Sequence, residues 1–79
     1  MPKFPIDAPQ SRVLFAFQAL GFIIVRQAEH VGLERRNADG TRTIISLPNH
    51  RRIKGATLRH ICTVAAIDRD EFLAAFERA

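Results

Sequence analysis

Apolar and polar residues alternate along this chain with two periods, one typical of helices and one typical of strands. Four apolar residues recur at helical spacing near the beginning: Val13, Leu14, Phe17 and Leu20. Asp7 precedes them as a candidate cap with Pro9 in the first turn, and Gly21 follows them as a stop signal. We therefore expect a helix over residues 8–20.

Three segments with strand character follow this helix. Residues 22–27 are apolar and β-branched, and residues 31–36 place apolar side chains on one face and charged ones on the other. Residues 37–40 supply turn chemistry, and the β-branched segment 41–47 then ends at Pro48. The pattern predicts a three-stranded antiparallel meander.

The last third of the chain returns to helical spacing. A polar loop over residues 48–53 leads to an apolar stripe formed by Leu58, Ile61, Cys62 and Ala65. Asp68 and Glu71 have the spacing of a capping box in front of a short last helix. The sequence therefore predicts one α+β domain over residues 1–79, a two-layer αβββα sandwich with a short C-terminal helix.

Positive charge is concentrated in the middle of the chain. The formal net charge is +4, and residues 26–59 hold eight basic residues against three acidic ones. This distribution favours an anionic partner, but charge alone does not separate RNA, DNA, an acidic protein and a membrane surface.

Several classes of site and location are disfavoured by the sequence. Cys62 and three scattered histidines have no zinc-ligand spacing, so we expect no metal and no other cofactor. No stretch approaches the roughly 20 apolar residues that span a bilayer, and residues 1–5 do not lead into a signal-peptide segment. We expect a cytoplasmic protein that does not enter a membrane.

Five segments, in this order and at these spacings, resemble proteins of the HicA family. They are Leu20-Gly21-Phe22, Val25-Arg26-Gln27-Ala28-Glu29-His30, Leu47-Pro48-Asn49-His50, Lys54-Gly55-Ala56-Thr57-Leu58-Arg59 and Ala65-Ala66-Ile67. The resemblance covers almost the whole chain. It implies a fold like that of double-stranded-RNA-binding domains, metal-independent cleavage of mRNA by a toxin of a type II toxin–antitoxin system, and inhibition by a HicB-type antitoxin.

The resemblance also implies a catalytic histidine in the connection between the first two strands, where His30 lies. Cleavage of RNA without a metal needs a base that takes the proton from a 2′-hydroxyl, whose oxygen then attacks the neighbouring phosphorus. Histidine is suited to this step because an unperturbed imidazole has a pKa of about 6.5. We expect His30 to be the general base.

The developing charge on the phosphate needs hydrogen-bond donors and cations. The predicted RNA contacts come from the basic segment and from the start of the second helix, where backbone amides favour a phosphate. They are Arg26, Arg51, Arg52, Lys54, Gly55 and Thr57.

Three positions depart from the pattern that this family commonly shows. Ala28 and Glu29 stand where the family has Gly followed by Ser or Asn, and Ala66 stands where it has Gly. Glu29 would either repel the RNA or polarise the imidazole of His30. Loss of a glycine would narrow the approach of the backbone to a phosphate.

Other residues have simpler interpretations. We expect His50 to be a loop or RNA contact, His60 to lie on the surface, and Cys62 to be a small core side chain. The hairpin arginines either form a solvated sheet edge or contact RNA; they are Arg35, Arg36 and Arg42. The phenylalanines expected at packing positions are Phe17, Phe22, Phe72 and Phe76.

Three other functions fit the same features. A pure protein-interaction module would meet an acidic antitoxin with its basic face, and it need not exclude the nuclease, since an inhibitor would cover the same face. A catalytically inactive RNA-binding domain would keep the fold and the basic segment but not the cleavage. A helix-turn-helix DNA-binding module would use the last two helices, but residues 69–78 hold three acidic residues against two arginines, which is unfavourable for a recognition helix.

Overall fold

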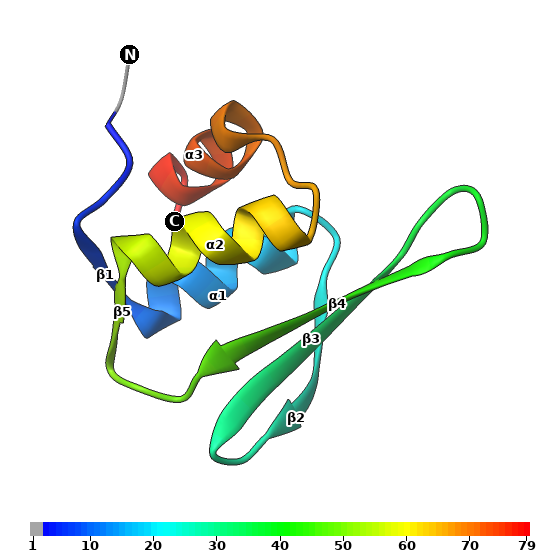
Figure 1. Cartoon of the computed structure of the whole chain (residues 1–79), viewed down its shortest axis with the longest axis horizontal. Coiled ribbons are helices and arrows are strands. Elements are labelled where there is room, and N and C mark those ends of the chain that lie inside the picture. The colour runs from blue at the N-terminus through cyan, green and yellow to red at the C-terminus, as the bar shows by residue number, and fades with distance from the viewer. Residues whose placement is uncertain (1–2) are drawn as a thin grey trace.

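The structure, a computed structural model, describes residues 3–79, and within them the chain forms eight elements in the order β1-α1-β2-β3-β4-β5-α2-α3 (Figure 1). Figure 1 shows the helices gathered on one side of the large sheet. The helices are α1 (Gln10–Ala19), α2 (Gly55–Val64) and α3 (Arg69–Glu77). The predicted α+β class is confirmed.

The large sheet is an antiparallel meander of neighbouring strands. Its strands, in spatial order, are β2 (Ile23–Gln27), β3 (His30–Arg36) and β4 (Arg42–Pro48). Their bounds lie within one residue of the predicted ones, because the period-two alternation and the turn at residues 37–40 are strong local signals. His30 is the first residue of β3 and not part of the connection between β2 and β3. Its expected position in that connection is therefore wrong by one residue.

A small second sheet is the feature that the sequence did not reveal. Strand β1 (Asp7–Pro9) pairs antiparallel with β5 (Arg52–Lys54), and Ala8 lies opposite Ile53. We expected residues 48–53 to be a loop and residue 8 to begin the first helix. The loop is confined to residues 49–51, and the expected start of the helix is wrong because α1 begins at Gln10. Each three-residue strand acquires its structure from a partner about 45 positions away.

The predicted cap of the first helix is also wrong. The N-cap residue of α1 is Pro9, and the Asp7 carboxylate instead accepts a hydrogen bond from the Arg52 guanidinium at 2.7 Å. Helix α2 begins at Gly55, directly after its N-cap residue Lys54, and no side chain makes a capping hydrogen bond there. Thr57 lies inside the first turn and does not cap the helix. Pairing of β1 with β5 fixes where both helices begin.

The core extends from the large sheet to the helices and continues between α1 and α3, where Phe72 and Phe76 lie. Four phenylalanines are buried there as expected: Phe17, Phe22, Phe72 and Phe76. Helix α3 is held against α1, because Arg12 donates to the Phe76 carbonyl at 3.1 Å. Asp68 caps α3 as predicted, its carboxylate accepting from the Glu71 amide at 3.2 Å. Throughout residues 3–79 there is no helix with the length and apolar character to cross a membrane.

Cys62 belongs to this core and not to a reactive site. Its side chain is buried on α2, and burial raises the pKa of the thiol to about 11. A thiol with such a pKa stays protonated at neutral pH and is a poor nucleophile. The interpretation of Cys62 as a small core residue is confirmed.

Helices α1 and α2 end with the same pair of hydrogen bonds. After α1, Gly21 donates to Gln18 O and Phe22 to Phe17 O, and after α2, Ala66 and Ile67 repeat this pattern. The residue that makes the turn has a left-handed backbone in both cases, with φ of +96° at Gly21 and +55° at Ala66. At position 66, then, a glycine would serve to end the helix.

We predict that Ala66→Gly stabilises the protein. An L-residue with a left-handed backbone costs roughly 1–2 kcal/mol, and the exposed Ala66 methyl group offers little packing in return. Allowing for the greater freedom of glycine in the unfolded chain, the free energy of unfolding should rise by about 0.5–1 kcal/mol in urea titrations. The matched variant Gly21→Ala should be destabilised, and equal stability of all three proteins would contradict the prediction.

Candidate functional site

The face of the large sheet that points away from the helices carries the candidate site. Alternation along the strands buries Val31 and Leu33 of β3 beneath the helices and turns His30, Gly32 and Glu34 to the opposite side. We call this opposite side the outer face. It lies open at the end of the sheet where β2 turns into β3.

An open cleft of about 640 Å³ occupies that end of the outer face. We call it the His30 cleft, and the residues that line it are Arg26, Ala28, Glu29, His30, Gly32 and Ser46. Arg26 and His30 therefore share one cleft, whereas the sequence left open which of the basic residues lies beside His30. A solvent-exposed imidazole next to a guanidinium can take a proton from a ligand while the cation holds an anion.

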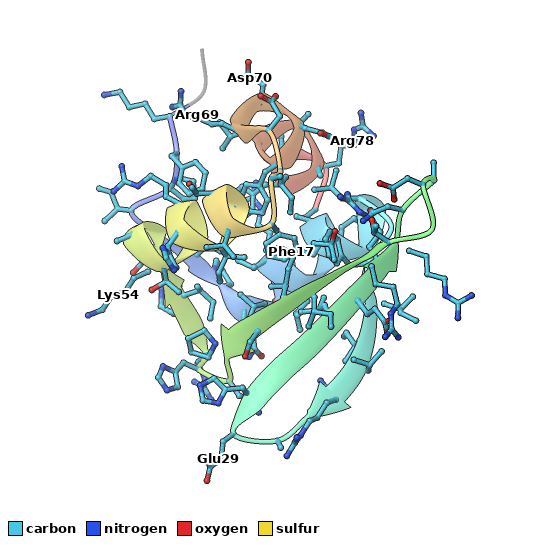
Figure 2. All side chains as sticks on the ribbon, turned by 45° about the vertical axis from the view of Figure 1, so that its right-hand side comes forward. Phe17, Glu29, Lys54, Arg69, Asp70 and Arg78 are labelled. Carbon is cyan, nitrogen blue, oxygen red and sulfur yellow. The ribbon has the colours of Figure 1, made fainter. Side chains whose placement is uncertain are left out.

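Glu29 is the acidic residue of the His30 cleft. Figure 2 shows its side chain extending outward from the β2–β3 turn, away from the body of the domain. From this position the carboxylate adds negative charge to the rim of the cleft. The structure thus places Glu29 where either effect considered above, repulsion of RNA or polarisation of His30, acts at the cleft.

Asn49 fixes the turn that carries this cleft. Its side-chain amide donates to Ala28 O at 2.7 Å, and its backbone amide donates to Glu29 O at 3.2 Å. The Asn49 side-chain oxygen, Oδ1, in turn accepts a hydrogen bond from the Gln10 side chain at 2.8 Å. Helix α1, the β2–β3 turn and the segment after β4 are therefore joined through one amide side chain.

A second, smaller cleft of about 250 Å³ lies beyond β4. We call it the Lys54 cleft, and its lining residues are Pro48, His50, Arg52, Ile53, Lys54 and Thr57. Because Pro48 pairs with His30 across β3 and β4, the two clefts are neighbours. The predicted RNA contacts therefore separate into Arg26 beside His30 and a group of three in the Lys54 cleft.

The members of the Lys54 cleft differ in how freely they can bind an anion. Arg52 already pairs with Asp7, with both side chains about half exposed, whereas Lys54 extends outward at the start of α2 (Figure 2). The expected loop position of His50 is confirmed, and this residue lines the cleft together with these cations.

Gly55 and Arg51 are placed differently from the other candidates. The Gly55 amide donates to Ile6 O at 2.6 Å, and the residue is buried, so the expectation of a free amide there is wrong. The residue is glycine for a packing reason, because a Cβ atom would collide with the backbone of Pro5. Arg51 is exposed between β4 and β5, and its carbonyl accepts from the Gln10 amide at 2.9 Å.

The arginines of the β3–β4 hairpin are largely engaged in the fold. Arg35 donates to Asn37 and to Leu20 O, and its guanidinium lies 4.7 Å from the centre of the Phe22 ring. Arg42 pairs with Glu34 at 2.8 Å. These contacts favour the interpretation of the hairpin arginines as a structural edge, with Arg36 left exposed.

Helix α3 lies on the side of the molecule opposite to the His30 cleft. Figure 2 shows Arg69, Asp70 and Arg78 at one end of the molecule and Glu29 at the other. The apolar side of α3 is buried in the core, and its first turn carries Asp70 and Glu71. This arrangement is unfavourable for a helix that enters the groove of DNA.

Sequence reasoning missed the residues that shape the site without charge. Asn49, Gly32 and Ser46 belong to three different segments and had no shared motif. Asn49 does lie within the Leu47-Pro48-Asn49-His50 segment. An amide side chain there can both donate and accept hydrogen bonds, and this was the signal that could have identified it as a residue that fixes a turn. Across residues 3–79, His, Cys, Asp and Glu side chains do not gather in groups of three or more that could hold a metal ion.

Comparison of the chain with protein-family models, with curated proteins and with solved structures finds no match in any of the three. A function for this chain is therefore inferred from the geometry of the two clefts.

We predict that Asn49→Ala loosens the β2–β3 turn. The variant loses the hydrogen bond to Ala28 O and the one from Gln10, each worth about 0.5–1.5 kcal/mol. Amide hydrogen exchange of Ala28, which donates to His30 O at 3.1 Å, should become faster. Asn37→Ala, which removes comparable bonds from the β3–β4 hairpin, is the control, and similar protection of Ala28 in both variants would argue against the role of Asn49.

The ion pair between Asp7 and Arg52 predicts a pH dependence of stability. The hydrogen bond from Arg52 lowers the pKa of Asp7 below its ordinary value of 3.8. A carboxylate with a lowered pKa stabilises the fold above its unfolded pKa and loses this contribution as the pH falls. Below about pH 4, the unfolding free energy of the wild type should therefore fall more steeply than that of Asp7→Asn, measured by urea titration. Arg52→Gln should flatten the profile in the same way, and parallel profiles for all three would refute the assignment.

Proposed function

We propose that this protein is a metal-independent endoribonuclease of the HicA type, a toxin that cuts mRNA in the cytoplasm with His30 as general base. The observation that carries the proposal is that His30 and Arg26 line one open cleft on the outer face. A base and a phosphate-binding cation are the two groups that this reaction needs.

The fold supports the proposal. Elements α1, β2, β3, β4 and α2 follow the αβββα order, which is that of double-stranded-RNA-binding domains. The helices cover one face of the large sheet and leave the outer face free (Figure 1). We propose that this chain has the same fold with the additional small sheet of β1 and β5.

The reaction can be written with the residues of the His30 cleft. His30 accepts the proton of a ribose 2′-hydroxyl, and the oxygen forms a bond to the adjacent phosphorus. The bond from phosphorus to the 5′-oxygen of the next nucleotide breaks, and that oxygen takes a proton from water. The products are a 2′,3′-cyclic phosphate and a 5′-hydroxyl, and Arg26 stabilises the charge on the phosphate oxygens during the step.

The Lys54 cleft would hold the RNA backbone next to the cleavage point. Its cations lie beyond the pairing of His30 with Pro48, so one strand of RNA could contact both clefts. Phosphate contacts of this kind are electrostatic, and the affinity for RNA should fall as salt is added.

The proposed partner is a HicB-type antitoxin that covers the outer face. Three exposed apolar residues belong to strands β2 and β4 of the large sheet: Ile23, Val25 and Ile44. An inhibitor with an acidic surface and apolar contacts would be complementary to the cations and to these side chains.

A non-cleaving RNA-binding domain is the second candidate, and Glu29 is the observation that favours it. A carboxylate at the rim of the His30 cleft disfavours an anionic substrate there. The Lys54 cleft would still bind the RNA backbone in such a protein.

We predict that the purified protein cuts a long mRNA in the presence of a chelator and that His30→Ala lowers the rate by about 10²- to 10⁴-fold, the usual contribution of a positioned base. Product ends should carry a cyclic phosphate. His60→Ala, which changes an exposed histidine of α2 that lines neither the His30 cleft nor the Lys54 cleft, is the control and should keep full activity.

The same experiment separates the two candidates. If the wild type binds RNA and leaves it intact, the protein is a binding domain. If His30→Ala cuts as fast as the wild type, His30 is not the base.

A further inference from the structure

One row of residues crosses the outer face next to His30. Strand register places Arg26 of β2 opposite Gly32 of β3, and Gly32 opposite Ser46 of β4. All three line the His30 cleft. The row therefore consists of a cation, a bare stretch of backbone and a hydroxyl group, with the glycine at its centre.

The fold itself does not require glycine at position 32. Its backbone lies outside the left-handed region, and a Cβ atom would meet Arg26 Cβ at 3.5 Å and Val25 Cγ2 at 3.7 Å, which are ordinary contacts. Glycine within a strand weakens it and marks places where a ligand or another backbone approaches closely. No other strand covers this side of β3 in residues 3–79, so the space above Gly32 is open to a ligand.

Spacing relates Gly32 to the proposed chemistry. His30 and Gly32 lie two residues apart on the same face, which is roughly 6.6 Å along a strand. A ribose with its 2′-hydroxyl at His30 would have its base within reach of Gly32. A planar ring can lie on the glycine peptide because no side chain lifts it, while Ser46 can donate to or accept from the edge of the ring.

We propose that Gly32 is the floor of a nucleobase subsite, in which the base next to the cleaved bond lies on the β3 backbone between Arg26 and Ser46. The ligand is an unstacked base, and the substrate at this point is therefore single-stranded RNA. The identity of the ligand rests on the proposed ribonuclease function, whereas the shape of the subsite rests on the register of the three strands.

Titration of the ¹⁵N-labelled wild-type protein with each of the four nucleoside 3′-monophosphates tests the subsite without cleavage. The amide signals of Gly32 and Ser46 should shift with at least one nucleotide, and ribose 5-phosphate, which lacks a base, should leave them in place. Equal shifts with ribose 5-phosphate would show a sugar-phosphate site and overturn the proposal. No shift with any nucleotide would also overturn it. The open space above Gly32 would then be interpreted as a contact for a side chain of a protein partner.

Gly32→Ala tests the subsite in catalysis. The added methyl group should lower kcat/KM for RNA by about 10- to 200-fold, the usual effect of one such group in a fitted pocket. The variant should melt at or above the temperature of the wild type, because alanine is more favourable than glycine in a strand. Asp70→Glu adds one methylene group to an exposed side chain of α3, at the opposite end of the molecule from Glu29 (Figure 2), and should leave kcat/KM unchanged.

The two experiments distinguish failure of the subsite from failure of the nuclease. Full activity of Gly32→Ala in a protein that cuts RNA removes the subsite and leaves the nuclease. A wild type that does not cut RNA, but whose Gly32 amide shifts with nucleotides, removes the nuclease and leaves the base-binding site.

Discussion

Val31 and Leu33 of β3 are fully buried against the helical layer, and the alternation of side chains along a strand then turns His30 and Gly32 to the outer face. A shift of register by one residue would bring His30 toward the core and expose Leu33, at a cost of several buried side chains. Strand β4 is fixed in the same way, because Ile45 and Leu47 are buried on its inner side. The position of the candidate base therefore follows from hydrophobic burial on the opposite side of the sheet.

Polar contacts then set the local geometry that burial leaves free. Asn49 joins the β2–β3 turn to helix α1, and the pairing of β1 with β5 brings Arg52 to Asp7. These contacts are exposed, so each is worth little alone. Their effect is on position, because they hold the two clefts beside each other on a domain too small to support a large core.

The basic residues of the chain separate into two populations. Arg35 and Arg42 are engaged with the protein itself, whereas Arg26 and Lys54 line open clefts. Net charge alone could not make this distinction, because a guanidinium over an aromatic ring and one in a cleft have the same formal charge. The places where an anionic ligand can bind are therefore decided by which cations are not already paired with groups of the protein itself.

The α+β class, the meander and the core phenylalanines were readable from the sequence, because period-two and helical spacing are local properties that burial enforces. His30 and Arg26 were both named as candidates from the sequence, but only the structure brought Arg26, and not the other predicted RNA contacts, into the cleft of His30. The strands β1 and β5 were not predictable, since three-residue strands depend on a distant partner. It was also not predictable that Arg52 would pair with Asp7 and that the Gly55 amide would donate to Ile6 O. The row of Arg26, Gly32 and Ser46 exists because strand register brings three separate segments together. Local pattern thus determined the three helices and the three strands of the large sheet and which side of each is buried, while tertiary pairing formed β1 and β5 and decided which polar groups remain free to bind a ligand.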